Sequence, residues 1–128
     1  MGTRSTVKFY EDNVNILSVY QQYDGAIEGV GKQVADLLRK YTVVNGVGHT
    51  NQANGISELA LFYIVDNKKK NGNIYATNQG DEQEFNYEVR STWGAVEKDK
   101  INVKVFRSDG HVLFDGNAND YIDFVDFD

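Results

Sequence analysis

The sequence predicts a single α+β domain over residues 1–128, in which two helices pack on one face of an antiparallel sheet. Three observations predict it: two apolar segments have the spacing of helices, the segments on either side alternate like strands, and no linker or internal repeat divides the chain. In chain order the expected elements are two strands, two helices, four strands and a short final helix, or ββααββββ(α). A chain of 128 residues also has the usual length of one domain.

The first two strands are expected to form a β-hairpin. Residues 3–10 alternate between two faces, and residues 14–22 are rich in Val, Ile, Leu and Tyr. Asp12 and Asn13 stand between them and supply the turn. A short polar turn between two such segments indicates a hairpin.

Two helices follow the hairpin. The first spans residues 30–41, where apolar side chains recur at helical spacing: Val30, Val34, Leu37, Leu38 and Tyr41. The second spans residues 56–66 and is apolar on nearly all sides, which a central buried helix explains better than a surface helix. Residues 42–55 between them are predicted to be a long polar loop. The lysines of residues 67–72 are read either as a helix C-terminus or as a binding patch.

Four strands complete the predicted sheet, over residues 74–77, 84–91, 100–107 and 112–115. In the third of them, one face carries only apolar side chains, and the other carries Lys100, Asn102 and Lys104. This alternation suits an antiparallel sheet with one hydrated face. Asn119 is the expected N-cap of a short terminal helix.

Composition excludes several kinds of chemistry. The chain has no cysteine, which rules out disulfides, thiolate metal sites and cysteine nucleophiles. His49 and His111 are isolated and lack the spacing of metal ligands, so no metal or cofactor is expected. No apolar run approaches the roughly 20 residues of a membrane span, and no secretory signal is evident, so a cytoplasmic protein is expected. A net charge of −6 argues against nucleic acid as a partner.

The acidic residues are concentrated at the end of the chain. After Arg107 there is no Lys or Arg, and six aspartates follow: Asp109, Asp115, Asp120, Asp123, Asp126 and Asp128. One reading is a solvated acidic end. The other is an acidic patch that mimics nucleic acid toward a basic protein.

The segment Tyr20–Gly31, YQQYDGAIEGVG, is the strongest candidate for a ligand site, because it gathers aromatic and polar groups at a strand-to-helix junction. Tyr20 and Gln22 are expected on one face of the strand. Gly29 and Gly31 are expected to offer free N–H groups to an anion at the start of the helix. Position 34 is valine where a dinucleotide fingerprint needs glycine, so that motif is absent.

Other groups extend this predicted site. The hairpin would bring Arg4 near Asp24, either to hold a phosphate or to form an ion pair. Loop asparagines would close the site. The predicted ligand-binding residues are Arg4, Ser5, Tyr20, Gln22, Tyr23, Asp24, Gly29, Gly31, Asn45, Asn51 and Asn54. Several of them also have a structural reading: a turn that needs glycine, a core tyrosine, or a turn stabilised by the side chain of Asp24. No residue is predicted to be catalytic, although Asp24 and Glu28 flank the glycine turn.

Several motifs resemble a group of short uncharacterised phage and prophage proteins. The resemblance covers most of the chain and rests on GTRST followed by KFY, on YQQYDG and GVG, and on the Asn45-Gly46, Asn54-Gly55 and Tyr87-Glu88-Val89 segments. It implies a small phage type of protein. Such proteins often counter host defence, either by binding a defence protein or by sequestering a nucleotide-derived immune signal.

The leading expectation is therefore a non-enzymatic binding module for a small anionic, nucleotide-like ligand, acting in phage counter-defence. A homo-oligomer is expected, because small ligand-binding proteins often place the pocket between subunits. The alternative is an inhibitor that presents the acidic C-terminal end to a basic host defence protein. A third reading is a hydrolase of the same ligand class.

Overall fold

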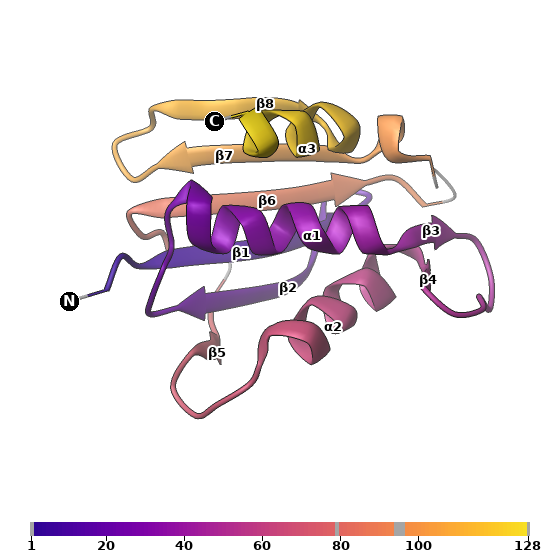
Figure 1. Ribbon diagram of the computed structural model, residues 1–128, viewed down its shortest axis with the longest axis horizontal. Coiled ribbons are helices and arrows are strands. Elements are labelled where there is room, and N and C mark those ends of the chain that lie inside the picture. The colour runs from indigo at the N-terminus through magenta and orange to yellow at the C-terminus, as the bar shows by residue number, and fades with distance from the viewer. Residues whose placement is uncertain (1, 79, 94–96, 128) are drawn as a thin grey trace.

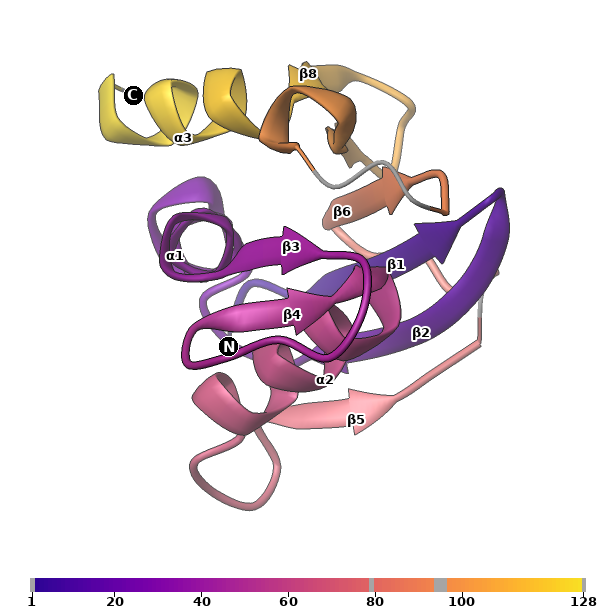
Figure 2. The same cartoon turned by 90° about the vertical axis from the view of Figure 1, so that its right-hand side faces the viewer.

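The computed structural model describes residues 2–78, 80–93 and 97–127 (Figure 1). A six-stranded sheet has the strand order β5-β2-β1-β6-β7-β8. Figure 2 shows the three helices on one side of this sheet. The α+β class is confirmed, but three helices cover the sheet where two were predicted.

The strands of the sheet have the bounds β1 Ser5–Glu11, β2 Val14–Gln21, β5 Ile74–Ala76, β6 Phe85–Ser91, β7 Asn102–Arg107 and β8 Val112–Asn117. All neighbouring pairs are antiparallel except β1 and β6, which are parallel. The prediction of a purely antiparallel sheet was wrong at this pair. A pairing between segments some 80 residues apart follows from the crossover through the helices and β5, which no local pattern reveals.

The predicted hairpin of β1 and β2 is confirmed. Asp12 (φ 53°) and Asn13 (φ 64°) both have left-handed backbone angles. Two such residues in a two-residue loop twist in the same sense as the strands they join. Asp and Asn tolerate this conformation better than most residues.

The helices are α1 Lys32–Lys40, α2 Gly55–Asn67 and α3 Ala118–Phe127. α1 lies between the other two, with α3 packed on β7 and β8 and α2 on β1 and β2 (Figure 1). A π-helical segment, Ile27–Gly31, runs directly into α1, so the helical region begins earlier than predicted. The terminal helix is confirmed and anchored by Tyr121, which is fully buried. Its predicted N-cap was wrong, because Asn119 lies within the helix and Asn117 Oδ1 accepts the Asp120 N–H (2.9 Å). No helix of the described residues is long and apolar enough to span a membrane.

The predicted loop 42–55 contains a second, small sheet. β3 (Thr42–Val44) and β4 (Gln52–Asn54) pair in parallel beyond the C-terminal end of α1 (Figure 1). Val43 and Ala53 are buried, which explains why these short segments are ordered as strands. The sequence did not predict this pairing, because the residues between the two short strands are mostly polar.

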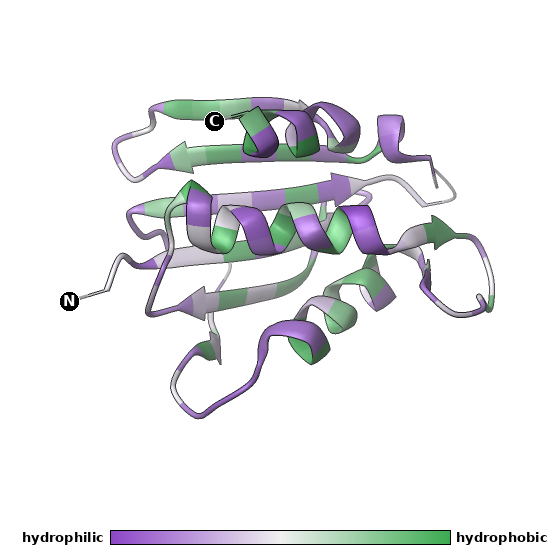
Figure 3. Cartoon of the chain, viewed as in Figure 1, coloured by the Kyte–Doolittle hydropathy of each residue, from purple (hydrophilic) through white to green (hydrophobic). Residues whose placement is uncertain are grey.

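The hydrophobic core lies between the helices and the sheet. The inward side chains of the central strands are fully buried, among them Val7, Phe9, Tyr87, Val89, Val103 and Val105. Figure 3 shows α1 alternating between hydrophilic and hydrophobic residues, whereas α2 carries hydrophobic residues on the side that faces the viewer as well. The amphipathic α1 is thus a normal core helix, and α2 has apolar surface in excess of what the core uses.

The opposite face of the sheet is polar. Lys8, Glu88, Lys104 and Asp115 stand side by side on β1, β6, β7 and β8. Thr6 Oγ1 donates to Asn86 Oδ1 (2.8 Å), so buried polar groups on this face are paired. The hydrated face predicted from the alternation in β7 is confirmed on that strand, where Asn102 and Lys104 are partly exposed. On β1 the same face is polar but buried, since Lys8 is only 3% exposed.

Candidate functional site

The glycines of the Tyr20–Gly31 segment are needed for close packing. A Cβ atom at Gly29 would lie 2.0 Å from the carbonyl oxygen of Asp24. A Cβ atom at Gly25 would lie 2.8 Å from the Cβ atom of Ser5. These distances are far below van der Waals contact, so the segment can take its path only without side chains there.

The backbone N–H groups expected to hold an anion are already bonded within the segment. Gly29 and Gly31 both donate to the carbonyl oxygen of Ala26, at 3.0 and 3.2 Å. The adjacent hollow, of about 280 Å³, is lined by two carboxylates, Asp24 and Glu28. Negative charge and the absence of free donors at these two glycines disfavour a phosphate at this turn.

Three predicted residues at the end of β2 lie near one another. The Tyr20 hydroxyl donates to Gln22 Oε1 (3.0 Å), which agrees with their predicted common face. Tyr23 is half exposed, with Lys70 Nζ 5.9 Å from its ring centre. Arg4 is exposed, and its side chain forms no ion pair with any described residue, Asp24 included.

The other predicted residues lie elsewhere. Ser5 is fully buried, and its hydroxyl has no hydrogen-bond partner in the described part of the chain. Asn45, Asn51 and Asn54 lie at the β3–β4 end of α1, away from Asp24 and the glycines (Figure 1). Asn54 Oδ1 accepts the Gly46 N–H (3.0 Å), which organises that loop. The structure therefore does not gather the predicted residues around one cavity.

Buried tyrosines hold the predicted segment against the core. The hydroxyls of Tyr87 and Tyr121 donate to the carbonyl oxygens of Gly25 and Gly31, both at 2.7 Å. The Tyr63 hydroxyl donates to Gln21 Oε1 beneath α2. Burial raises the pKa of all three tyrosines well above the ordinary value. They stay neutral donors and serve the fold rather than proton transfer.

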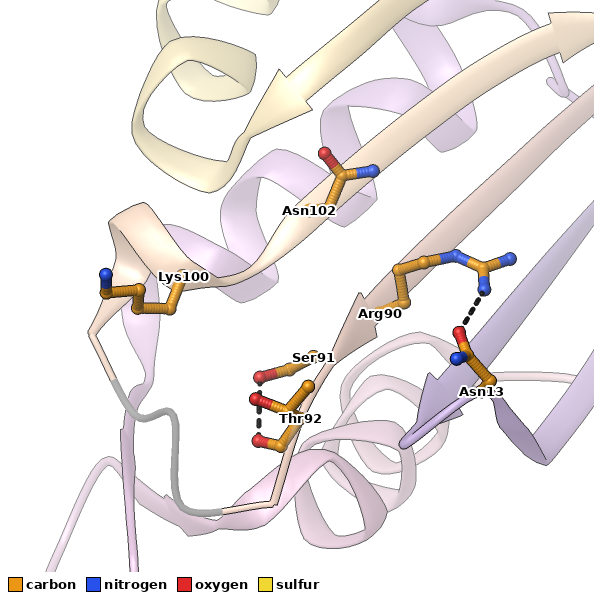
Figure 4. Close-up of a pocket in the computed structure, with 6 residues that line it drawn as sticks. All are labelled: Asn13, Arg90, Ser91, Thr92, Lys100 and Asn102. Carbon is orange, nitrogen blue, oxygen red and sulfur yellow. Dashed lines mark hydrogen bonds between the residues drawn. The ribbon is translucent and has the colours of Figure 1, made fainter.

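A different cavity is lined by polar and basic side chains (Figure 4). It has a volume of about 190 Å³ and lies where β6 ends, beside the β1–β2 turn. The lining residues are Asn13, Arg90, Ser91, Thr92, Lys100 and Asn102. No carboxylate belongs to this set. We call it the Arg90 pocket.

The guanidinium of Arg90 is held in place on three sides. Its Nη2 donates to Glu88 Oε1 (2.9 Å), and its Nη1 donates to Asn13 Oδ1 (3.4 Å; Figure 4). The ring of Tyr10 lies beneath it, 4.1 Å from the guanidinium carbon to the ring centre. An arginine has five N–H donors, so donors remain for a ligand. A fixed guanidinium loses little conformational entropy on binding.

The two charged side chains among the described lining residues, Arg90 and Lys100, are both positive. Glu88 is the partner of Arg90, and Lys8 and Lys104 flank Glu88 on the neighbouring strands. Lys100 lines the pocket and forms no ion pair with a described residue. Asp12 and Asp99 are the chain neighbours of Asn13 and Lys100, and Asn102 donates to Asp115, so the wider surroundings carry charges of both signs. In a chain of net charge −6, the positive charge is confined to Arg90 and Lys100 in the lining of this pocket.

Sequence reasoning missed the Arg90 pocket, although parts of its signal were present. The hydrated face of residues 100–107 and the Asp12-Asn13 turn were both identified from the sequence. The link between them was missing, because Asn13 meets Arg90 only through the parallel pairing of β1 with β6.

Comparisons of the chain with protein-family models, curated proteins and solved structures gave no match. The described residues also contain no group of three or more His, Asp or Glu side chains that could hold a metal ion. The candidate site therefore rests on geometry and charge.

Proposed function

We propose that this protein is a non-enzymatic binding module for a small anionic, nucleotide-like ligand, and that the Arg90 pocket holds the ligand's phosphate. The observation that carries the proposal is the fixed guanidinium of Arg90 in a cavity whose described lining residues include no carboxylate. Arginine recognises phosphate through two parallel hydrogen bonds, and charge-assisted bonds are the stronger kind.

The size of the pocket limits what it can hold. Ligand pockets commonly measure roughly 300–1,000 Å³. At about 190 Å³, the Arg90 pocket suits one anionic group and not a whole nucleotide. In this proposal the pocket is an anchor, and the sugar and base extend over the polar face of the sheet.

Each lining residue has its own proposed contact with the ligand. Arg90 binds two phosphate oxygens, and Lys100 supplies a second, mobile positive charge. The hydroxyl of Thr92 and the amides of Asn13 and Asn102 can donate to the remaining oxygens or to a ribose. Among the residues that the structure describes, neither imidazole nor carboxylate lines the pocket, which favours binding over hydrolysis in this proposal.

A role in phage counter-defence is proposed on the sequence resemblance. Sequestration of an immune signal requires binding without turnover, which agrees with the lining of the pocket. In the alternative, an inhibitor of a basic defence protein, α3 would be the contact surface. Asp120 and Asp123 are exposed on α3, whereas Asp126 is partly neutralised by Arg39 at 2.7 Å.

These alternatives need a test that leaves the fold intact. Removing residues after Gly116 would also remove Tyr121, which is fully buried, and would damage the core. Replacing both Asp120 and Asp123 by Asn keeps the helix and removes two charges. Loss of counter-defence activity in that variant with ligand binding unchanged would favour the inhibitor.

The proposed binding is tested by thermal unfolding of the purified protein with inorganic phosphate, mononucleotides and cyclic oligonucleotides. A ligand that binds only the folded state raises the melting temperature, and the stabilisation grows with the logarithm of one plus its concentration over Kd. Mass spectrometry after denaturation then distinguishes release of the intact compound, which we expect, from release of products. If no phosphate-bearing compound of the panel raises the melting temperature, the proposed function is wrong.

A further inference from the structure

Helix α2 carries an apolar stripe that the core does not use. Its inner side buries Ile56, Leu59, Ala60 and Tyr63 against the sheet. On its outer side, Leu61 is 60% exposed and Val65 is 67% exposed. An isolated exposed leucine is ordinary, but two apolar residues one helical turn apart form the start of a contact surface.

The surface continues from α2 onto the edge of the sheet. A groove of about 310 Å³ separates α2 from β2 and β5 and is almost entirely apolar. Its lining includes Leu17, Val19, Leu61, Ile64, Ile74 and Tyr75. Strand β5 pairs only with Val19–Gln21, so the earlier part of β2 forms an outer edge, where Val14 and Ile16 are exposed. Apolar patches of this extent mark interaction sites.

The charges at the two ends of the stripe have opposite signs. Glu58 lies in the first turn of α2, and Lys68 follows its last residue, Asn67. Glu58, Leu61, Val65 and Lys68 are spaced three, four and three residues apart, which places them along one side of the helix. Among the described residues, the Lys68 ammonium bonds only to uncharged oxygens, those of Lys70 and Asn73. Its charge is therefore available to a carboxylate of a partner.

We propose that this stripe binds the same stripe of a second copy of the chain, with the two α2 helices antiparallel about a two-fold axis. An axis between Leu61 and Val65 places Leu61 opposite the partner subunit's Val65. The same axis places Glu58 opposite the partner subunit's Lys68, so both ends are complementary at once. A parallel arrangement would instead bring the lysines of both copies together.

A second copy fits this surface better than an unrelated protein, because one chain supplies both the acidic and the basic end. Two-fold contacts are also the most common kind in homo-oligomers, since each patch meets itself. The groove beside α2 receives side chains from the partner helix and enlarges the contact. The Arg90 pocket lies on the other face of the sheet, so dimerisation and anion binding are independent.

The first test is the oligomeric state by light scattering after gel filtration. The wild-type chain is expected to be a dimer, and Leu61→Lys is expected to raise its dissociation constant about 100-fold or more, because it places an ammonium in an apolar contact. Phe127→Lys is the matched control, since Phe127 is 88% exposed on α3, and it should remain dimeric. A monomeric wild-type chain, or a Leu61→Lys variant that dimerises normally, would overturn the proposal.

The second test fixes the register of the helices. The chain has no cysteine, so introduced cysteines can pair only with each other. Leu61→Cys and Val65→Cys chains, one carrying a tag, are mixed and oxidised. The antiparallel register predicts that the disulfide between the two different chains forms faster than either disulfide between identical chains. Equal rates for all three species would contradict the register. Melting temperatures of each variant confirm that it is folded.

Discussion

At the scale of single residues, the sequence around Gly29 and Arg90 misleads about which of them lies at a candidate anion site. Gly29 lies in a segment that has the composition of an anion site, yet its N–H is bonded to Ala26 and its Cα packs against Asp24. Arg90 lies in an ordinary strand, yet its guanidinium is fixed beside a cavity. In both cases, contacts with distant or crowded neighbours decide the role.

The glycine at position 29 is predicted to be essential to stability. Gly29→Ala should lower the free energy of unfolding by about 3 kcal/mol or more, because the new methyl group would overlap the Asp24 carbonyl oxygen. Gly80→Ala is the matched control, since a Cβ atom there meets nothing within 4 Å, and it should change stability by less than about 0.5 kcal/mol. Urea unfolding measures both. Equal stability of the two variants would show that the close packing at Gly29 is not needed.

The buried hydroxyl of Tyr63 is predicted to contribute to stability through its hydrogen bonds. Tyr63→Phe removes the hydroxyl that donates to Gln21 Oε1, and Gln21 is buried. The expected loss is about 1–3 kcal/mol, measured by urea unfolding. The bond from Gln21 Nε2 to Gln33 Oε1 (3.1 Å) does not replace the lost donor, so an unchanged stability would show that the tyrosine hydroxyl does not stabilise the fold.

At the scale of elements, the buried tyrosines link the helices to the segment Tyr20–Gly31. Tyr87 comes from β6, Tyr121 from α3 and Tyr63 from α2, and burial raises the pKa of each. In the unfolded chain a tyrosine ionises near pH 10. Below that pH both states carry neutral tyrosines, so these groups add no pH dependence.

The free energy of unfolding is therefore predicted to fall as the pH rises above about 10, because these three tyrosines then ionise in the unfolded chain and stay neutral in the folded one. Denaturant unfolding between pH 8 and pH 11.5 measures this slope. The Tyr121→Phe variant should show a smaller slope, since one of the three raised groups is gone. A stability that stays constant up to pH 11.5 would contradict the neutral, buried state of these side chains.

At the scale of the whole molecule, local patterns predicted the elements but not the site. The hairpin, the helix of residues 56–66 and the hydrated strand 100–107 follow from turn residues and from periodicity, which act over a few positions. The parallel pairing of β1 with β6 and the small β3–β4 sheet depend on contacts between distant segments. The Arg90 pocket joins residues from positions 13 to 102, so only the assembled sheet reveals it.

The distribution of charge also becomes clear only in the folded molecule. The chain is acidic in total, yet the charged side chains that line the pocket, Arg90 and Lys100, are both positive, and the aspartates of α3 lie on the helix that packs on β7 and β8. The predicted site had Arg4 as its only basic side chain, beside Asp24 and Glu28. The two locations can therefore be separated by single substitutions of arginine.

The most direct measurement is calorimetric titration of the phosphate-bearing compound that stabilises the protein most, with the wild-type chain, Arg90→Ala and Arg4→Ala. Loss of a two-point, charge-assisted contact should weaken binding by Arg90→Ala about 10-fold to 100-fold. Arg4→Ala should bind within about 2-fold of wild type, because Arg4 is outside the Arg90 pocket. Normal affinity of Arg90→Ala together with loss of binding by Arg4→Ala would contradict the Arg90 pocket and return the site to the Tyr20–Gly31 segment.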